Sequence, residues 1–225
     1  MATLPPISRT GLSHEASDTL RRLIVTGDLK PAERLVERDI AVQLGISRTP
    51  LREAFFRLRQ EGLLSESPGR GLFVSPLNEA EITEIYQVLA ALERMAVLHT
   101  PRVEPEMLAL LKRASEKRAA AGGNVQRTIA ADLMWHEALT GFTSNRRVVQ
   151  MLRAPRALAE RYERAFFRIP TNRDRSAREH REIEKLVRAG DLAAAAARIE
   201  KHWLDNIEAM SAAIAQPARG ERRKR

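Results

Sequence analysis

Residues 36 to 61 carry two helical patterns separated by a very short turn, and this feature restricts the fold more than any other. Apolar residues recur at three- and four-residue intervals over Val36 to Leu44 and again over Ser47 to Glu61, which predicts two helices. The same spacing predicts an earlier helix over Ser13 to Thr26. A glycine follows each helix, as expected for residues that adopt the left-handed C-terminal cap: Gly27, Gly45 and Gly62.

Two short strands are predicted after the third helix. Leu64 to Glu66 and Leu72 to Ser75 flank the tetrapeptide Pro68-Gly69-Arg70-Gly71, which predicts a hairpin with an arginine at its tip. A hairpin that follows a helix-turn-helix forms a wing, and a wing can enter the minor groove of DNA. The sequence therefore predicts a winged helix-turn-helix domain over residues 1 to 76.

The start of the third helix carries the side chains best suited to contact DNA. Arg48 and Arg52 are four residues apart and share a helix face. Arginine binds guanine through two hydrogen bonds, while the hydroxyls of Ser47 and Thr49 reach phosphates or base edges. Ser47 is also predicted to cap this helix. The alternative is an ordinary solvated face, but the helix order and the hairpin together favour DNA recognition.

Composition limits the partners and the chemistry. The net charge is +9 and the sequence pI about 10.7, which makes nucleic acid the first partner to consider. Five basic residues and one acidic residue lie in positions 216 to 225, predicted to be a disordered tail. Cysteine is absent, so any metal must be held by His, Asp or Glu. No signal segment and no apolar run of ~18 residues is recognised, so we expect a cytoplasmic protein with no membrane partner.

Residues 77 to 215 are predicted to form a second domain, an all-α antiparallel bundle. The helical pattern continues through this range with short interruptions, which gives about six helices, and short connections imply antiparallel neighbours. The predicted breaks are Pro101 to Pro105, Gly122-Gly123, Gly141 to Asn145, Ile169 to Asn172 and Gly190-Asp191.

Three histidines and one aspartate of this bundle are candidate metal ligands. Asp132 and His136 are four residues apart and share one face of a helix, while His180 and His202 lie within two further helices. Such nitrogen and oxygen ligands suit Zn(II), Ni(II) or Mn(II). By spacing alone a satisfied core histidine is the commoner meaning, and convergence of the four residues is the point to test. The two remaining histidines, His14 and His99, are expected to be ordinary surface or core residues.

Residues 12 to 76 resemble the winged helix-turn-helix of the GntR family of bacterial transcription regulators. The resemblance rests on Gly27, Lys30-Pro31, Leu35, Glu37-Arg38, Ala41, Leu44-Gly45, Ser47-Arg48-Thr49-Pro50, Arg52-Glu53-Ala54, Leu58, Glu61-Gly62-Leu63 and Gly69-Arg70-Gly71, in order and at the family's spacing. It implies DNA contacts from Arg38, Arg48, Thr49 and Arg52, with Ser47 in support and Gly69, Arg70 and Gly71 in the wing. Ala32 departs from the family, which usually has glycine there.

The bundle is similar to the FCD ligand-binding domain of the family's FadR-like branch. The similarity rests on Asp132-x-x-x-His136, on His180 and on His202 some twenty residues later. It implies a metal centre that grips the carboxylate of a small acid. Many relatives carry arginine at the position of Leu89, and its absence here indicates a smaller or more apolar acid than a dicarboxylate or a sugar acid.

Three hypotheses follow. The leading one is a metabolite-responsive repressor, not an enzyme, that acts as a homodimer on a pseudo-palindromic operator in double-stranded DNA and senses a small carboxylic acid. The second is a metal-dependent hydrolase or lyase, although no residue at a motif spacing indicates a general base. The third is a regulator whose metal is only structural.

Overall fold

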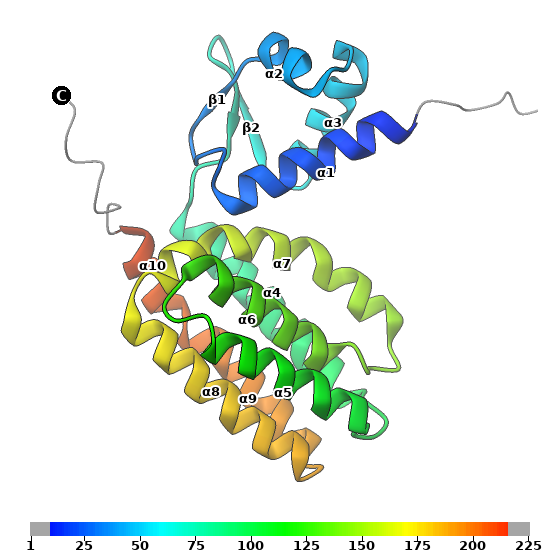
Figure 1. Cartoon of the computed structure of the whole chain (residues 1–225), viewed down its shortest axis with the longest axis vertical. Coiled ribbons are helices and arrows are strands. Elements are labelled where there is room, and N and C mark those ends of the chain that lie inside the picture. The colour runs from blue at the N-terminus through cyan, green and yellow to red at the C-terminus, as the bar shows by residue number, and fades with distance from the viewer. Residues whose placement is uncertain (1–9, 216–225) are drawn as a thin grey trace, which may run out of the picture. The chain divides into compact units, whose positions relative to one another are not determined.

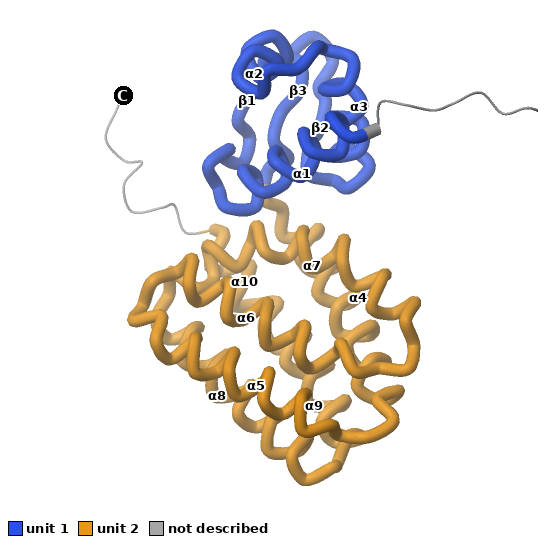
Figure 2. The backbone as a smooth tube through the Cα atoms, turned by 45° about the vertical axis from the view of Figure 1, so that its right-hand side comes forward, with its two compact units in different colours: residues 1–76 blue, residues 77–225 orange. Residues whose placement is uncertain are grey.

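The computed structural model describes residues 10 to 215, and these divide into two compact units between Pro76 and Leu77 (Figure 2). The tail predicted over residues 216 to 225 lies outside the described residues. Unit 1 combines helices with a small sheet and unit 2 is entirely helical (Figure 1). The fold is thus mainly α, a winged helix-turn-helix followed by a helical bundle, as the sequence predicts.

Unit 1 contains the predicted three helices and hairpin, together with one strand that the sequence does not reveal. Its elements are α1 (Thr10–Thr26), β1 (Arg34–Leu35), α2 (Glu37–Leu44), α3 (Arg48–Gln60), β2 (Leu64–Ser67) and β3 (Gly71–Val74). The antiparallel sheet has the order β1-β3-β2, with Arg34 opposite Phe73 and Leu64 opposite Val74. Two residues are too few to show an alternating pattern, so β1 is visible only through its pairing.

Turn residues set the path of the chain in unit 1. Gly45 ends α2 with φ 65°, the left-handed conformation that glycine adopts without strain. Ala32 has φ 63°, so the position where relatives carry glycine does require the left-handed conformation. Ser47 occupies the N-cap position of α3, but its side chain makes no capping hydrogen bond. The predicted side-chain cap is therefore wrong, and the exposed hydroxyl stays available.

Unit 2 is a bundle built around α4. Its helices are α4 (Glu79–Leu98), α5 (Pro105–Ala119), α6 (Val125–Thr140), α7 (Arg146–Phe167), α8 (Pro170–Arg188), α9 (Leu192–Asp205) and α10 (Ile207–Ala215). Helix α4 contacts α6, α7, α9 and α10. Its buried face places Ile82, Leu89 and Glu93 in the interior. Within the described residues no helix combines the length and the apolar character needed to cross a membrane.

The helical region over residues 77 to 215 contains one break more than the sequence predicts. The chain turns at Asn206, between α9 and α10, without a glycine or proline. The Asn206 side-chain amide donates to the backbone oxygen of His202 at 2.6 Å and to Oε2 of Glu179 at 3.2 Å. The break thus depends on a contact with another helix, which a local sequence pattern cannot show.

Candidate nucleic-acid interface and candidate metal centre

The residues predicted to contact DNA are all exposed in unit 1. Arg38 lies on α2, and Ser47 to Arg52 lie at the start of α3. Gly69 and Arg70 lie in the turn between β2 and β3, and Gly71 begins β3. The β2–β3 turn and α2 lie at the same end of the unit (Figure 1). Residues of α3 and of the hairpin, among them Arg52 and Gly71, also line one surface hollow of about 590 Å³. The start of α3 and the wing therefore form one continuous surface.

A carboxylate holds the two key arginines of α3. Glu37, the first residue of α2, accepts hydrogen bonds from Nε of Arg52 at 3.0 Å and lies 4.0 Å from Nε of Arg48. The arginine side chains remain 68% and 62% exposed. Exposed ion pairs of this kind contribute little to stability. Glu37 thus orients the guanidinium groups while they stay accessible at the surface of unit 1.

Three histidines of unit 2 converge in the interior of the bundle. His136 of α6, His180 of α8 and His202 of α9 each offer one ring nitrogen, and these three atoms lie within 4.8 Å of one another. The ring centroids are 5.1 to 5.6 Å apart, and all three side chains are buried. His14 and His99 lie outside this cluster, and both are exposed.

Buried carboxylates fix the orientation of two of these rings. Nδ1 of His136 lies 2.8 Å from Oε2 of Glu93, and Nδ1 of His202 lies 2.7 Å from Oε2 of Glu179. When Nδ1–H donates to a carboxylate, the lone pair is on Nε2, which is the usual arrangement of metal-ligating histidines. His180 stacks on Trp135 with ring centroids 3.6 Å apart, and neither of its ring nitrogens has a hydrogen-bond partner among the described residues. Because an unpaired buried nitrogen is costly, this ring fits a metal ligand better than a core residue.

Asp132, the fourth predicted ligand, lies beside this cluster and is paired with an arginine. Its Oδ2 is 3.5 Å from Nε2 of His136, and its Oδ1 is 3.8 Å from Nε2 of His180. The same Oδ1 accepts a hydrogen bond from Arg118 of α5. The structure thus brings the three histidines together and places Asp132 next to two of them. The four residues fit a divalent metal, provided that Asp132 can leave Arg118.

Electrostatics in the cluster differ from ring to ring. Burial alone would raise the pKa of Glu93, but His136 and Arg156 outweigh burial and lower this pKa to about 2. Burial would lower the pKa of His136, but Glu93 and Asp132 raise it to about 9. A metal at Nε2 of this ring must therefore displace a proton. Burial lowers the pKa of His180 and of His202, so these rings are neutral, the form that binds metals.

Sequence reasoning missed the side chains that position the candidate ligands. They are Glu93, Glu179, Arg118 and Arg156, of which Arg156 donates to Oε1 of Glu93 at 2.8 Å. Glu93 is fully buried, at helical spacing from Ile82 and Leu89. A charged residue on an otherwise apolar helix face indicates a buried ion pair, and this pattern could have identified Glu93 as a positioning residue. Glu179 and Arg118 lie among many other charged residues of their helices and carry no such signal.

Family models match most of the chain. The model described as "Bacterial regulatory proteins, gntR family" matches residues 12 to 74, and the model of the FCD domain matches residues 84 to 205. The first covers α2, α3, the hairpin and the arginines predicted to contact DNA. The second covers the three histidines and Asp132.

Relatives and solved structures agree with these matches. An uncharacterized HTH-type transcriptional regulator from the TAR-I ttuE-ttuC' intergenic region of Agrobacterium vitis is 38% identical over 140 residues, 59% of this chain and 81% of the relative. The "Probable D-xylose utilization operon transcriptional repressor" of Paenarthrobacter nicotinovorans is 30% identical over 198 residues, 84% of each chain. The structure of Escherichia coli McbR/YncC superposes with a TM-score of 0.76 at 23% identity, over 91% of this chain and 99% of that one.

Proposed function

We propose that this chain, which belongs to the GntR family of bacterial transcription regulators and carries an FCD domain, represses transcription in response to a small carboxylic acid. The families and relatives are DNA-binding transcription regulators, so the chain is a regulator and not the hydrolase or lyase considered from its sequence. The relative from Paenarthrobacter nicotinovorans, named as a probable transcriptional repressor, supports repression.

The proposed DNA-contacting residues are those predicted from the sequence. Their exposure at the start of α3 and in the wing supports this assignment, as does the pairing of Arg48 and Arg52 with a single carboxylate that DNA phosphates or bases can replace. Arg38, Ser47, Thr49 and the wing residues Gly69, Arg70 and Gly71 complete the interface. Among these residues, we assign the contacts to DNA base edges to Arg48 and Arg52 of α3.

The metal-dependent sensing rests on one observation above all others. Two of the converging histidines have Nδ1 anchored on buried carboxylates, and the third has no partner for either nitrogen. A hydrogen-bonded core histidine explains the first feature alone, whereas a metal centre explains both, because ligating histidines are anchored in this way and the unpaired ring of His180 gains a partner. We assign His136, His180, His202 and Asp132 as ligands of Zn(II), Ni(II) or Mn(II). When bound, such an ion supplies an open coordination position for a carboxylate oxygen.

A homodimer is proposed because unit 2 exposes an apolar stripe on α4. Val88, Met95 and Leu98 are 46%, 42% and 42% exposed and lie on one face of the helix. Exposed apolar patches mark association surfaces. Sedimentation equilibrium of the full chain tests this: wild type is expected to be a dimer and Met95→Glu largely a monomer. A Val42→Glu control changes an apolar residue of unit 1 that is 77% exposed, and it should remain a dimer.

A hydrogen-bonded tyrosine provides a route from the proposed sensor to the start of α4. Tyr162 of α7 is fully buried, and its hydroxyl accepts from the backbone N–H of Asn78 at 3.1 Å and donates to Glu81. The neighbouring Glu163 lines small cavities with His136 and His202. A shift of α7 at the metal centre would therefore reach the residue that caps α4, directly after the division between the units.

The test is a grid of thermal melts of the full-length protein, stripped and then reloaded with zinc, nickel or manganese, against acetate, butyrate and benzoate. Ligands that bind only the folded state raise the melting temperature by mass action. We expect at least one acid to stabilise the metal-loaded wild type, but neither the stripped protein nor Asp132→Ala. Stabilisation by metal without any acid effect would contradict the sensing role and favour a structural metal.

A further inference from the structure

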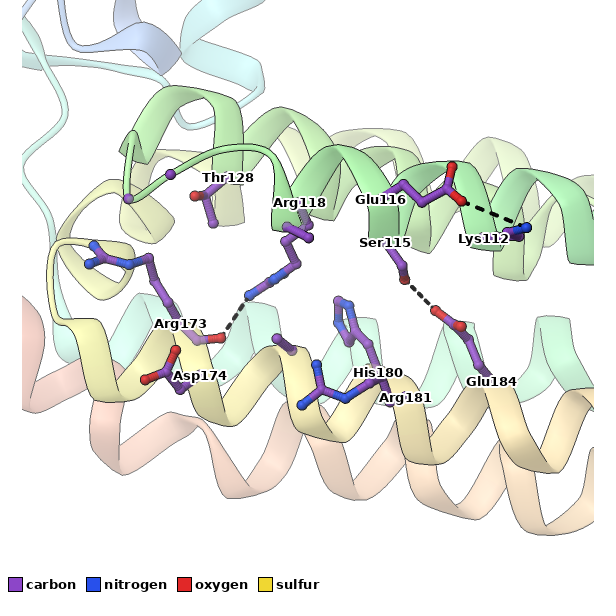
Figure 3. A pocket seen from close by; sticks show the side chains of 14 residues that line it. Lys112, Ser115, Glu116, Arg118, Thr128, Arg173, Asp174, His180, Arg181 and Glu184 are labelled. Carbon is purple, nitrogen blue, oxygen red and sulfur yellow. Dashed lines mark hydrogen bonds and ion pairs between the residues drawn. The ribbon is translucent and has the colours of Figure 1, made fainter.

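A large hollow opens on the side of unit 2 between α5, the start of α6 and α8 (Figure 3). Its volume of about 540 Å³ lies in the range of small-molecule sites. Its cationic side chains are Lys112, Arg118, Arg173 and Arg181. They outnumber the acidic side chains of the wall, Glu116, Asp174 and Glu184. Of these, Glu116 pairs with Lys112, and Glu184 accepts from Ser115 and Trp135. The hollow therefore suits a small organic anion.

Arg118 connects the wall of this hollow to the candidate metal centre. Its side chain is only 9% exposed, and its Nη1 donates to Oδ1 of Asp132. Its Nη2 donates to the backbone oxygen of Arg173 at 3.2 Å, and the guanidinium carbon lies 5.1 Å from the ring centroid of Phe167. Backbone and ring fix one side of the guanidinium group, while the other side depends on one carboxylate.

His180 reaches the same point from the opposite wall. In Figure 3 the side chains of Arg118 and His180 extend from α5 and α8 into the gap between the two helices. Nε2 of His180 lies 3.8 Å from Oδ1 of Asp132, the very oxygen that accepts from Arg118. The other oxygen, Oδ2, lies 3.5 Å from Nε2 of His136, so a divalent ion held by the histidines and the buried guanidinium group would compete for one carboxylate.

We propose that Arg118 is the carboxylate-binding residue of this regulator and that it exchanges Asp132 for the acid when a metal ion is bound. This inference rests on the proposed metal-dependent sensing of a small acid. A buried cation without a counter-charge is strongly unfavourable. When Asp132 leaves Arg118, the binding of another anion at the guanidinium group therefore becomes favourable. The planar guanidinium group can then bind a carboxylate in the hollow through two hydrogen bonds. Metal and acid thus bind cooperatively, and each raises the affinity for the other.

The experiment measures the affinity of the full-length protein for Zn(II) alone, by competition with a chromophoric chelator, and then the melting shift produced by benzoate or acetate. Arg118→Gln is compared with Arg181→Gln, which removes the same charge from the same hollow without a contact to Asp132. We expect Arg118→Gln to bind zinc about tenfold more tightly than wild type, because it removes a positive charge that competes with the ion for Asp132, and to lose the acid-induced shift. Arg181→Gln should bind zinc within about twofold of wild type and keep most of the shift.

Arg118→Lys covers the case in which the glutamine variant folds poorly. It keeps the charge but loses the planar fork, so we expect zinc affinity close to wild type and an acid response reduced at least threefold. Zinc binding that weakens in Arg118→Gln, or an acid response that survives in both variants, would overturn the role of Arg118. If wild type itself fails to bind zinc or fails to respond to acids, the proposed sensing is wrong and this inference falls with it.

Discussion

The two units use the same kinds of charged side chain in opposite ways. In unit 1 the arginines of α3 are 62% and 68% exposed and share the half-exposed Glu37. In unit 2 the fully buried Glu93 holds Arg156, which is 12% exposed, together with His136. An exposed pair can be broken at little cost, whereas a buried pair can be broken only at a large cost unless another charge replaces the lost partner. The proposed interface and the proposed sensor should therefore differ in their tolerance to mutation.

The largest expected effect is on the buried pair. Glu93→Gln keeps the shape of the side chain but leaves Arg156 and His136 without their counter-charge. Removing one partner of a buried ion pair typically costs about 3 to 5 kcal/mol, and we expect a loss of this size in the free energy of unfolding. Urea unfolding of the metal-free protein measures it.

The matched control is Glu200→Gln, which breaks a pair with Arg94 at the surface of the same unit. Its side chain is 41% exposed, so the expected loss is below about 1 kcal/mol. Equal losses in the two variants would erase the distinction between buried and exposed pairs.

The second prediction concerns the orientation of a candidate ligand. Glu179→Gln weakens the anchor of His202 and should lower zinc affinity about 10- to 100-fold, as is typical when the partner of a metal-ligating histidine is lost. Equilibrium dialysis with zinc measures the change. Glu182→Gln is the control, because Glu182 also pairs with Arg198 but is 48% exposed and makes no contact with His202. Similar zinc affinities in both variants would argue against the metal centre.

The third prediction concerns the exposed arginines. Arg48→Ala and Arg52→Ala should each weaken specific DNA binding by about 1 to 3 kcal/mol, because each loses contacts to base edges. Fluorescence anisotropy on a duplex selected in vitro with the full-length protein measures this. Stability should change by no more than about 0.5 kcal/mol. Arg102→Ala, an 80% exposed arginine of unit 2, is the control. Unchanged affinity in both α3 variants would refute the docking of α3.

The smallest expected effect concerns backbone strain in unit 1. The left-handed conformation of Ala32 costs roughly 1 to 2 kcal/mol for an L-residue, while glycine costs more chain entropy in the unfolded state. Ala32→Gly should therefore raise the free energy of unfolding by about 0.5 to 1 kcal/mol. Ala80→Gly, in the first turn of α4, should lower it, and stabilisation by both substitutions would contradict the explanation.

Part of each candidate site could be predicted from the sequence. The helix-turn-helix with its wing and the histidines of the bundle were found because short motifs and helical spacing are local properties. The sequence did not predict the pairing of Glu37 with Arg52, because the two residues lie on different helices and meet only when α2 packs against α3. The pairing of Arg118 with Asp132 was not predicted either, because the two side chains come from different helices, α5 and α6.

The sequence by itself determined the mainly helical class, the resemblance to the GntR and FCD families and the residue types available for metal binding. The helical class follows from periodicity and glycine positions, the resemblance from the order and spacing of short motifs, and the ligand types from the absence of cysteine, and none of these needs long-range contacts.

Only the tertiary structure decided which charges meet. The convergence of three histidines from α6, α8 and α9, the anchoring of two of them on Glu93 and Glu179, and the pairing of Asp132 with Arg118 all depend on how separate helices pack. The physical reason is that helical spacing fixes which residues share a face, whereas the packing of the whole bundle determines what that face contacts.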